Sequence, residues 1–146
     1  MVINMVTIKE FAITDYESAL TLWQNTEGVC NCEKCTLLDS KENIEKFLNR
    51  NPGLSFIAVE NGIVKGVVLA GHDGRTGIIY RLTVSEKLRE NGIGKQLVEK
   101  AVNGLKHEGL TIVKAFVLKD NNGGNAFWDK IGFTENNTAV TRFKIL

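Results

Sequence analysis

The sequence lacks a large excess of charge of either sign. Its 18 lysines and arginines oppose 17 aspartates and glutamates, which gives a formal net charge of +1 over 146 residues. Proteins that bind nucleic acid or anionic membranes over a broad surface usually carry a strong basic excess. We therefore expect neither nucleic acid nor a membrane as a partner, and any basic site should be local.

Long apolar runs and an export signal are also absent. No stretch is long enough to span a bilayer, and residues 1–6 show no basic region followed by an apolar core and a small-residue cleavage site. We expect a soluble, cytoplasmic protein. The sequence shows no repeats or low-complexity linkers, and 43% of its residues are hydrophobic. We expect one domain, residues 1–146, with a proper core.

Cysteine is scarce, and its three copies, Cys30, Cys32 and Cys35, lie within six residues. An odd number without an export signal argues against a disulfide framework. Three thiolates also fall one short of a closed zinc site, which His72 or His107 would have to complete. We therefore expect reduced thiols that bind no metal.

Periodicity and capping signals divide the first third of the chain. Residues 6–11 alternate like a strand, and Thr14-Asp15-Tyr16-Glu17 predicts a capping box for a helix that ends near Thr26. Residues 27–38 have no clear period and are predicted to form a loop. Asp39-Ser40-Lys41-Glu42 predicts a second capping box and a helix that ends at Asn51.

Strand signals dominate next. Asn61-Gly62 joins two apolar runs, residues 54–60 and 63–70, and favours a type I′ hairpin. Further elements are predicted as a strand at 78–84, a helix at about 92–107, a strand at 112–118, a short helix at 125–131 and a last strand at 138–146. Because a crossover helix joins the strands at 78–84 and 112–118, these two should be parallel in a mixed sheet.

The most informative stretch lies between the strand at 78–84 and the following helix. That helix opens directly on Gly92-Ile93-Gly94. The first N–H groups of a helix have no intrahelical partner and the helix dipole is positive there, so an anion is the natural occupant. Two glycines one residue apart would let the backbone approach such an anion. The alternative is that they only shape a tight turn.

Two motifs resemble one protein family. Arg89-Glu90-Asn91-Gly92-Ile93-Gly94 fits the Q/R-x-x-G-x-G/A signature of the GNAT superfamily of acyl-CoA-dependent N-acetyltransferases. Asn121, followed by Phe127-Trp128-Asp129-Lys130-Ile131-Gly132-Phe133, resembles the family's N-x-x-A-x-x-F-Y-x-K-x-G-F element. The resemblance is close over residues 63–133. It implies an α/β (α+β) fold with antiparallel N-terminal strands, about four helices and a parallel pair that splays apart to admit the acyl-CoA arm.

The resemblance also implies acetyl-CoA as the acyl donor. The N–H groups of residues 89–95 can bind its pyrophosphate, with added charge from Arg89 and from Lys87 or Lys95. The backbone edge of residues 82–84 can pair with the pantetheine amides. By resemblance, the N–H of Val84 serves as an oxyanion donor and Asn121 contacts the cofactor arm. The candidate cofactor-binding residues are Leu82, Thr83, Val84, Arg89, Glu90, Asn91, Gly92, Ile93, Gly94, Lys95, Asn121 and Phe127.

The candidate catalytic residues are Tyr80 and Trp128. Trp128 stands where many family members have a tyrosine that protonates the leaving thiolate, but an indole cannot give up its proton near neutral pH. The positions of the family's basic carboxylates align with Ile78 and Phe116, and neither is acidic. Tyr80 is therefore our first candidate for the base, ahead of His72 and Asp73. Glycine is common in the family at the position of Glu90.

The leading interpretation is an acetyl-CoA-dependent N-acetyltransferase that moves an acetyl group directly to a primary amine of a small molecule or a protein. Residues 27–38 and the nearby hairpin tip should grip this acceptor. The alternative is a catalytically weak or inactive acyl-CoA-binding sensor. A nucleotide binder is disfavoured, because Gly92-Ile93-Gly94 lacks both the Lys-Ser/Thr of a P-loop and the third glycine of a Rossmann motif. The sequence leaves the acceptor open, and also the choice between monomer and homodimer.

Overall fold

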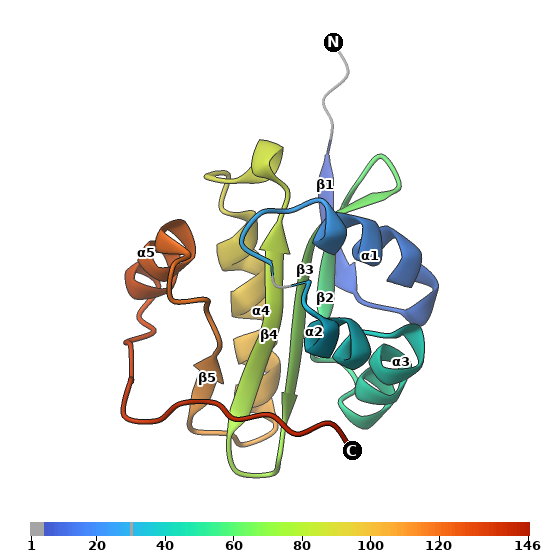
Figure 1. Ribbon diagram of the computed structural model, residues 1–146. Coiled ribbons are helices and arrows are strands. Elements are labelled where there is room, and N and C mark those ends of the chain that lie inside the picture. The colour runs from blue at the N-terminus through green and yellow to red at the C-terminus, as the bar shows by residue number, and fades with distance from the viewer. Residues whose placement is uncertain (1–4, 30) are drawn as a thin grey trace.

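A five-stranded mixed sheet with helices on both faces forms the protein (Figure 1). The computed structural model describes residues 5–29 and 31–146. Neighbouring strands are antiparallel from the first to the fourth, and the fourth and fifth are parallel, as predicted. The strands are β1 (Val6–Glu10), β2 (Phe56–Glu60), β3 (Ile63–His72), β4 (Gly77–Val84) and β5 (Val113–Ala115). The helices are α1 (Tyr16–Gln24), α2 (Glu33–Leu38), α3 (Lys41–Arg50), α4 (Ile93–His107) and α5 (Asn122–Lys130), with 3₁₀ turns at Ile13–Asp15 and Glu86–Leu88.

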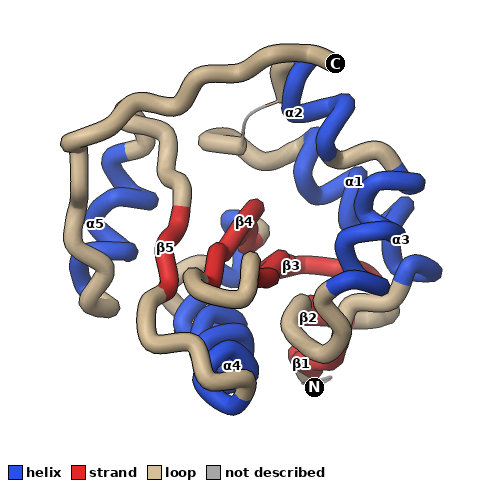
Figure 2. Tube along the Cα trace, turned by 90° about the horizontal axis from the view of Figure 1, so that it is seen from below, coloured by secondary structure: helices blue, strands red, loops and turns tan. Residues whose placement is uncertain are grey.

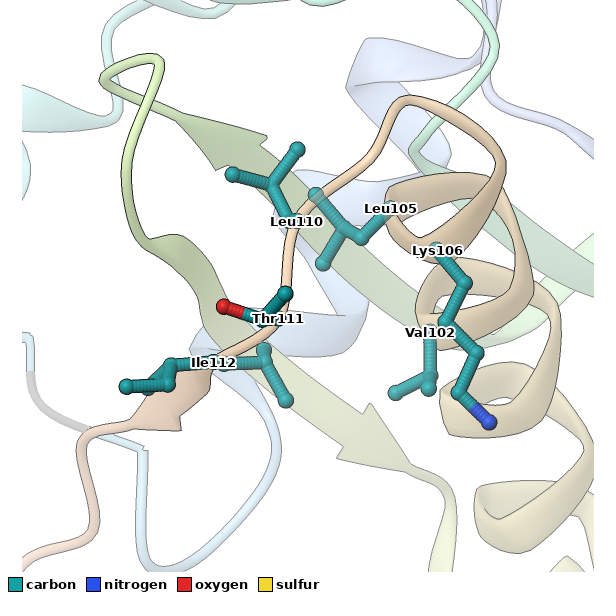
Figure 3. Close-up of a pocket in the computed structure, with 7 residues that line it drawn as sticks. Val102, Leu105, Lys106, Leu110, Thr111 and Ile112 are labelled. Carbon is teal, nitrogen blue, oxygen red and sulfur yellow. The ribbon is translucent and has the colours of Figure 1, made fainter.

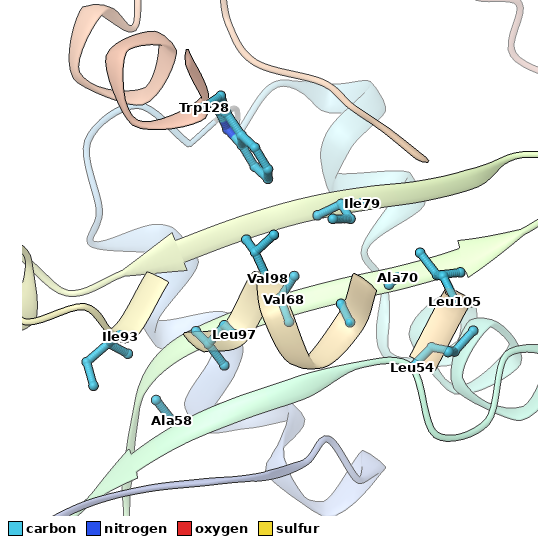
Figure 4. Close-up of a cluster of buried hydrophobic side chains, with 11 residues drawn as sticks. Leu54, Ala58, Val68, Ala70, Ile79, Ile93, Leu97, Val98, Leu105 and Trp128 are labelled. Carbon is cyan, nitrogen blue, oxygen red and sulfur yellow. The ribbon is translucent and has the colours of Figure 1, made fainter. Parts of the chain in front are cut away.

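Two apolar clusters hold the helices against the sheet. Seen along the strands, α4 lies on one side of β3 and β4, and α1 and α3 lie on the other (Figure 2). Side chains alternate across a strand, so Val68 and Ala70 of β3 pack on the α4 side while Val67 and Leu69 pack on the α1 side. Leu97 and Leu105 of α4 point into the first cluster (Figure 4). The sheet is therefore buried on both faces.

The turn between β2 and β3 has the predicted geometry. Asn61 and Gly62 both have positive φ, 52° and 75°. A type I′ turn requires this conformation at both central residues, and it matches the twist of the flanking strands. The Asn-Gly pair thus fixes the register of the hairpin.

A bulge in β4 separates two regions of pairing. Leu69 lies opposite Tyr80, but Val67 lies opposite Thr83, so β4 has one extra residue here. Arg81 lies in this bulge with a φ of 53°. The parallel pairing of β4 with β5 ends just before it, at Ile79. Because bulges bend a strand and end its pairing, β4 leaves β5 at this point, and the predicted splay is confirmed.

Several predicted element boundaries were wrong. Residues 33–38 form helix α2 instead of a loop, and β5 covers three residues instead of 112–118. Residues 138–146 form no strand. This tail instead passes on the α1 and α3 side of the sheet toward α2, where the Lys34 ammonium lies 5.8 Å from the centre of the Phe143 ring (Figures 1 and 2). Its apolar side chains stay exposed, because this alternating segment pairs with no strand of the sheet.

The predicted capping boxes were also displaced. Thr14 lies inside a 3₁₀ turn, in which the Asp15 carboxylate accepts the N–H of Ala12 at 3.1 Å. The cap of α3 is Ser40, whose Oγ accepts the N–H of Asn43 at 3.2 Å. A hydroxyl at the position before the first helical residue is a typical N-cap.

No helix formed by the described residues is both long and apolar enough to cross a bilayer.

Candidate active site

Backbone N–H groups gather where β4 leads into α4. We call residues 89–95 the amide turn. Gly92 is the N-cap of α4 with a φ of 77°, and the first helical bond runs from the N–H of Gln96 to the carbonyl of Gly92 at 3.0 Å. Arg89 donates its own N–H to the carbonyl of Glu86 at 3.3 Å. Among the described residues, no hydrogen bond engages the N–H groups of residues 90–95. The amide turn thus presents six unpaired donors.

Local packing explains why the chain adopts this shape. Ile93 is 7% exposed and anchors the first turn of α4 in the core, while residues 89–92 are exposed. A Cβ atom at Gly94 would lie 3.4 Å from the Phe127 ring and 3.6 Å from Val84, so α4 begins close to both α5 and the end of β4. Glu90 adopts a φ of 69°, a conformation that costs most side chains about 1 kcal/mol. This strain explains why glycine would suit that position.

The strand before the amide turn has an outer edge that β5 does not cover, residues 82–84. Ser85 donates its N–H to the carbonyl of Lys65 on β3 at 2.8 Å. Hydrogen-bonding direction alternates along an antiparallel strand, so the N–H of Val84 faces away from β3 and toward this outer edge. The carbonyl of Val84 accepts Nε of Arg89 at 3.2 Å. The Arg89 side chain therefore ties the amide turn to the outer edge of β4.

Two hydroxyls at this edge differ in their roles. Thr83 is 3% exposed and its Oγ1 donates to the carbonyl of Arg81 at 3.0 Å, so its side chain stabilises the bulge. Ser85 has a buried Oγ with no hydrogen-bond partner among the residues that the structure describes. A buried hydroxyl usually has a partner, so the Oγ of Ser85 is a polar atom in need of one. Sequence reasoning missed Ser85, because a serine after a strand reads as an ordinary turn residue.

Asn121 lies at the start of α5, where it acts as a helix cap. Its Oδ1 accepts the N–H of Gly124 at 2.9 Å. The backbone of Gly28 lies against the same side chain, since a Cβ at Gly28 would come within 2.9 Å of the Asn121 Nδ2. The segment that precedes α2 therefore contacts the start of α5. No sequence signal pointed to this contact.

Tyr80 and Trp128, the predicted catalytic residues, pack on opposite faces of the sheet. Trp128 is 8% exposed and belongs to the cluster under α4, with its ring edge-to-face against Phe127 and Phe133 at 5.4 and 4.7 Å between centroids. Figure 4 shows it pointing from α5 toward Ile79. Tyr80, the residue after Ile79, faces α3 instead. The structure therefore gives Trp128 a core position and does not bring the two together.

Aromatic rings surround Tyr80 where β4 and β5 part. Its ring stacks on Phe116 at 6.0 Å and meets Phe47 of α3 edge-on at 5.9 Å. Burial raises the pKa of the Tyr80 hydroxyl above its ordinary value of 10.0. A hydroxyl with a raised pKa stays protonated near neutral pH, so it can donate a hydrogen bond but is a poor base.

The other two candidate bases lie at the far end of β4. His72 is the last residue of β3, and Asp73 follows it in the turn to β4, at the end opposite to the amide turn (Figure 1). The His72 Nε2 contacts the Glu108 carboxylate at 2.5 Å, and its Nδ1 accepts the N–H of Gly74 at 3.0 Å. Backbone N–H groups of Thr76 and Arg75 lower the pKa of Asp73 to about 2. Both side chains therefore hold this turn together.

A buried ion pair joins the start of α3 to the bulge. The Arg81 guanidinium contacts the Asp39 carboxylate, and both side chains are 14% exposed. The guanidinium also lies 5.6 Å from the Trp23 ring. Burial raises the pKa of the Asp39 carboxyl, and the nearby Arg81 partly offsets this effect. The ion pair holds the start of α3 against β4 at the point where the strand bends.

Two hollows in the surface lie away from the amide turn. One of about 80 Å³ is between the end of α4 and the segment that leads into β5 (Figure 3). Another of about 340 Å³ is between the end of β1 and α3. Neither is lined by the amide turn or by the outer edge of β4. Within residues 5–29 and 31–146, no three potential metal ligands come together, and Cys30 lies outside the described residues.

Known proteins resemble this chain in both sequence and fold. A model of the acetyltransferase (GNAT) family matches residues 18–133. The chain is 31% identical over 130 residues to an acetyltransferase of Pectobacterium atrosepticum, covering 86% of each chain. A GNAT-family acetyltransferase of Staphylococcus aureus has a similar structure, with a TM-score of 0.79, 18% identity, and coverage of 92% of this chain and 86% of that one.

A PaiA N-acetyltransferase of Thermoplasma acidophilum, solved in complex with coenzyme A, has a TM-score of 0.77 at 21% identity. The match covers 92% of this chain and 93% of that chain. The structural likenesses show the fold, and the family model spans well over half of the sequence. The chain belongs to the acetyltransferase (GNAT) family.

Proposed function

We propose that this protein transfers the acetyl group of acetyl-CoA directly to a primary amine. The main support for this proposal is that the amide turn has six unpaired N–H groups at the positive end of α4. Such donors bind phosphate oxygens without any sequence-specific side chain. Arg89 adds a guanidinium within the same turn. A pyrophosphate is the anion that best uses so many donors at once.

The outer edge of β4 would hold the remainder of the cofactor. An unpaired strand edge binds an extended chain of amides as another strand would, and the pantetheine arm carries two such amides. The N–H of Val84 faces this edge and can donate either to the arm or to the oxygen that becomes negative during transfer. The unpartnered Oγ of Ser85 lies next to it. These residues therefore fit the cofactor.

Bound acetyl-CoA would supply an activated thioester, and this chain's own residues would orient it and manage protons. Tyr80 lies where β4 leaves β5, with a hydroxyl whose pKa is raised. We propose that this hydroxyl donates a proton or hydrogen bond to the leaving thiolate. The role of base, expected from the sequence, is less favourable for a group that stays protonated. Trp128 would support the site through packing.

The acceptor would bind on the α3 side of β4. Phe116 is 58% exposed and Tyr80 is 37% exposed, so their stacked rings present an apolar surface beside the proposed thioester position. Exposed aromatic rings attract both apolar groups and cationic amines. We infer that the accepted amine carries an apolar part that contacts these rings.

Acetyl transfer can be tested with acetyl-CoA and a panel of amines, by following thiol release and the mass of the acetylated product. We expect release that depends on the amine. Tight binding of acetyl-CoA without release for any acceptor would favour the sensor alternative. Tyr80→Phe should lower the rate of transfer and leave acetyl-CoA affinity unchanged. An unchanged rate at every pH would remove Tyr80 from the mechanism.

A further inference from the structure

Two cysteines lie in contact at the start of α2. The Sγ atoms of Cys32 and Cys35 are 3.3 Å apart, with Cys32 donating a thiol hydrogen bond to Cys35. A disulfide bond is about 2.05 Å long, so the two sulfurs need to approach by little more than 1 Å. Neither thiol is deeply buried, and Cys32 is the more exposed of the two. Oxidants in solution can therefore reach the pair.

The backbone holds this pair in position. Thr36 donates both its N–H, at 2.9 Å, and its Oγ1, at 3.0 Å, to the carbonyl of Cys32. Asp39 closes the helix by donating its N–H to the carbonyl of Cys35 at 2.9 Å. Both ends of the Cys-Glu-Lys-Cys segment are thus fixed by hydrogen bonds. Small rotations of the two side chains would be enough to close the disulfide.

We propose that Cys32 and Cys35 form a reversible, redox-active dithiol. In the oxidising direction, the Cys32 thiolate attacks a small-molecule disulfide such as oxidised glutathione, and one glutathione thiolate leaves. The Cys35 thiolate then attacks the Cys32 sulfur of the mixed disulfide and displaces the second glutathione. The two protein thiols lose two electrons, and the released glutathione thiolates take up the two protons. The more exposed Cys32 is the attacking group because the small disulfide can reach it.

The pair lies between two contacts that join this segment to the rest of the protein. The segment before it contacts Asn121 at Gly28, and α2 leads directly into Asp39, which pairs with Arg81 in the β4 bulge. A disulfide would lock the turn between these two contacts. The proposal itself does not depend on acetyl transfer, since the exchange can be measured without any amine or acetyl-CoA.

Trypsin offers a direct test, because Lys34 separates the two cysteines. Cleavage there places Cys32 on the peptide of residues 10–34 and Cys35 on the peptide of residues 35–41. The full chain, as wild type and as Cys30→Ser, is equilibrated with a fixed mixture of reduced and oxidised glutathione. The remaining thiols are then blocked, and the digest is analysed by mass spectrometry. We expect the two peptides to be linked in both proteins, and separate again after reduction.

Unfolding the protein tests whether the fold, and not only the short spacing of the two cysteines, favours the disulfide. The ratio of disulfide to dithiol should be on the order of tenfold higher in native Cys30→Ser than in the same protein in concentrated urea, because the fold holds the thiols together. Cys32→Ser and Cys35→Ser, once circular dichroism shows the wild-type fold, should show no link between the two peptides. Equal ratios in both states would overturn the proposal. A link that persists in Cys32→Ser would also overturn it, because it would assign the bond to Cys30.

Discussion

Gly92→Ala tests the amide turn most directly. Gly92 has a φ of 77°, which an alanine adopts at a cost of about 1 kcal/mol. No clash adds to this cost, since the nearest atom to a new Cβ is the Gln96 Nε2 at 3.9 Å. The free energy of unfolding should therefore fall by about 1 kcal/mol, a few degrees in melting temperature for a chain of this length.

Gly94→Ala is the matched control, with the same added methyl group two residues away. Gly94 lies in the first turn of α4 and has no positive φ, so alanine gains up to about 1 kcal/mol in helix propensity. Its Cβ would meet the Phe127 ring at 3.4 Å, an ordinary contact distance. The free energy of unfolding of this variant should equal or exceed that of the wild type.

The two variants should also differ in coenzyme A affinity. Alanine at position 92 favours negative φ values, so the turn should shift partway in that direction and move the neighbouring N–H groups away from a common anion. We expect its Kd for coenzyme A to rise at least about tenfold, which corresponds to 1.4 kcal/mol. Gly94→Ala should change the Kd by less than about threefold.

Urea unfolding without ligand and calorimetric titration with coenzyme A measure the two effects separately. Wild-type coenzyme A affinity in Gly92→Ala, at the expected loss of stability, would show that the amide turn does not bind the cofactor. An unchanged stability would instead show that residue 92 does not need a positive φ.

Three further predictions concern charge and packing. Arg89→Gln should raise the Kd for coenzyme A about tenfold, because it removes a charge-assisted bond, and the effect should be smaller at high salt. Lys106→Gln, at the other end of α4, should leave this Kd unchanged. Equal effects of the two variants in a calorimetric titration would contradict the prediction. Asp39 has a raised pKa in the folded state, so its carboxyl contributes stability that is fully present below pH 3.8 and is lost as the pH rises through the raised value. Urea unfolding on both sides of pH 3.8 should show this loss in the wild type and not in Asp39→Asn, and parallel curves would refute it. Leu97→Ala, at a site that is 0% exposed, should lower the free energy of unfolding by about 2–5 kcal/mol, whereas the exposed Lys100→Ala should change it by about 0.5 kcal/mol or less.

Features that depend on a few neighbouring residues could be predicted from the sequence. Asn61-Gly62 accepts two positive φ angles, so the hairpin between β2 and β3 could be predicted. The apolar spacing from Ile93 to Leu105 predicted α4 and its buried face. Gly92 at the helix start predicted unpaired amides at residues 89–95, and the structure leaves those of residues 90–95 unpaired, while the N–H of Arg89 bonds to Glu86. Each of these signals acts through local backbone geometry, which the sequence states directly.

The groups that meet across the sheet could not be predicted from the sequence. The bulge at Arg81 depends on the pairing of β4 with β3 and leaves residues 82–84 with an open outer edge. Packing against the helices also places Trp128 in the core under α4 and turns Tyr80 toward α3. The same alternating pattern that predicted a strand at 138–146 found no partner strand. Long-range pairing and burial set these outcomes, because a strand edge or a side-chain face has no meaning until its neighbours are in place.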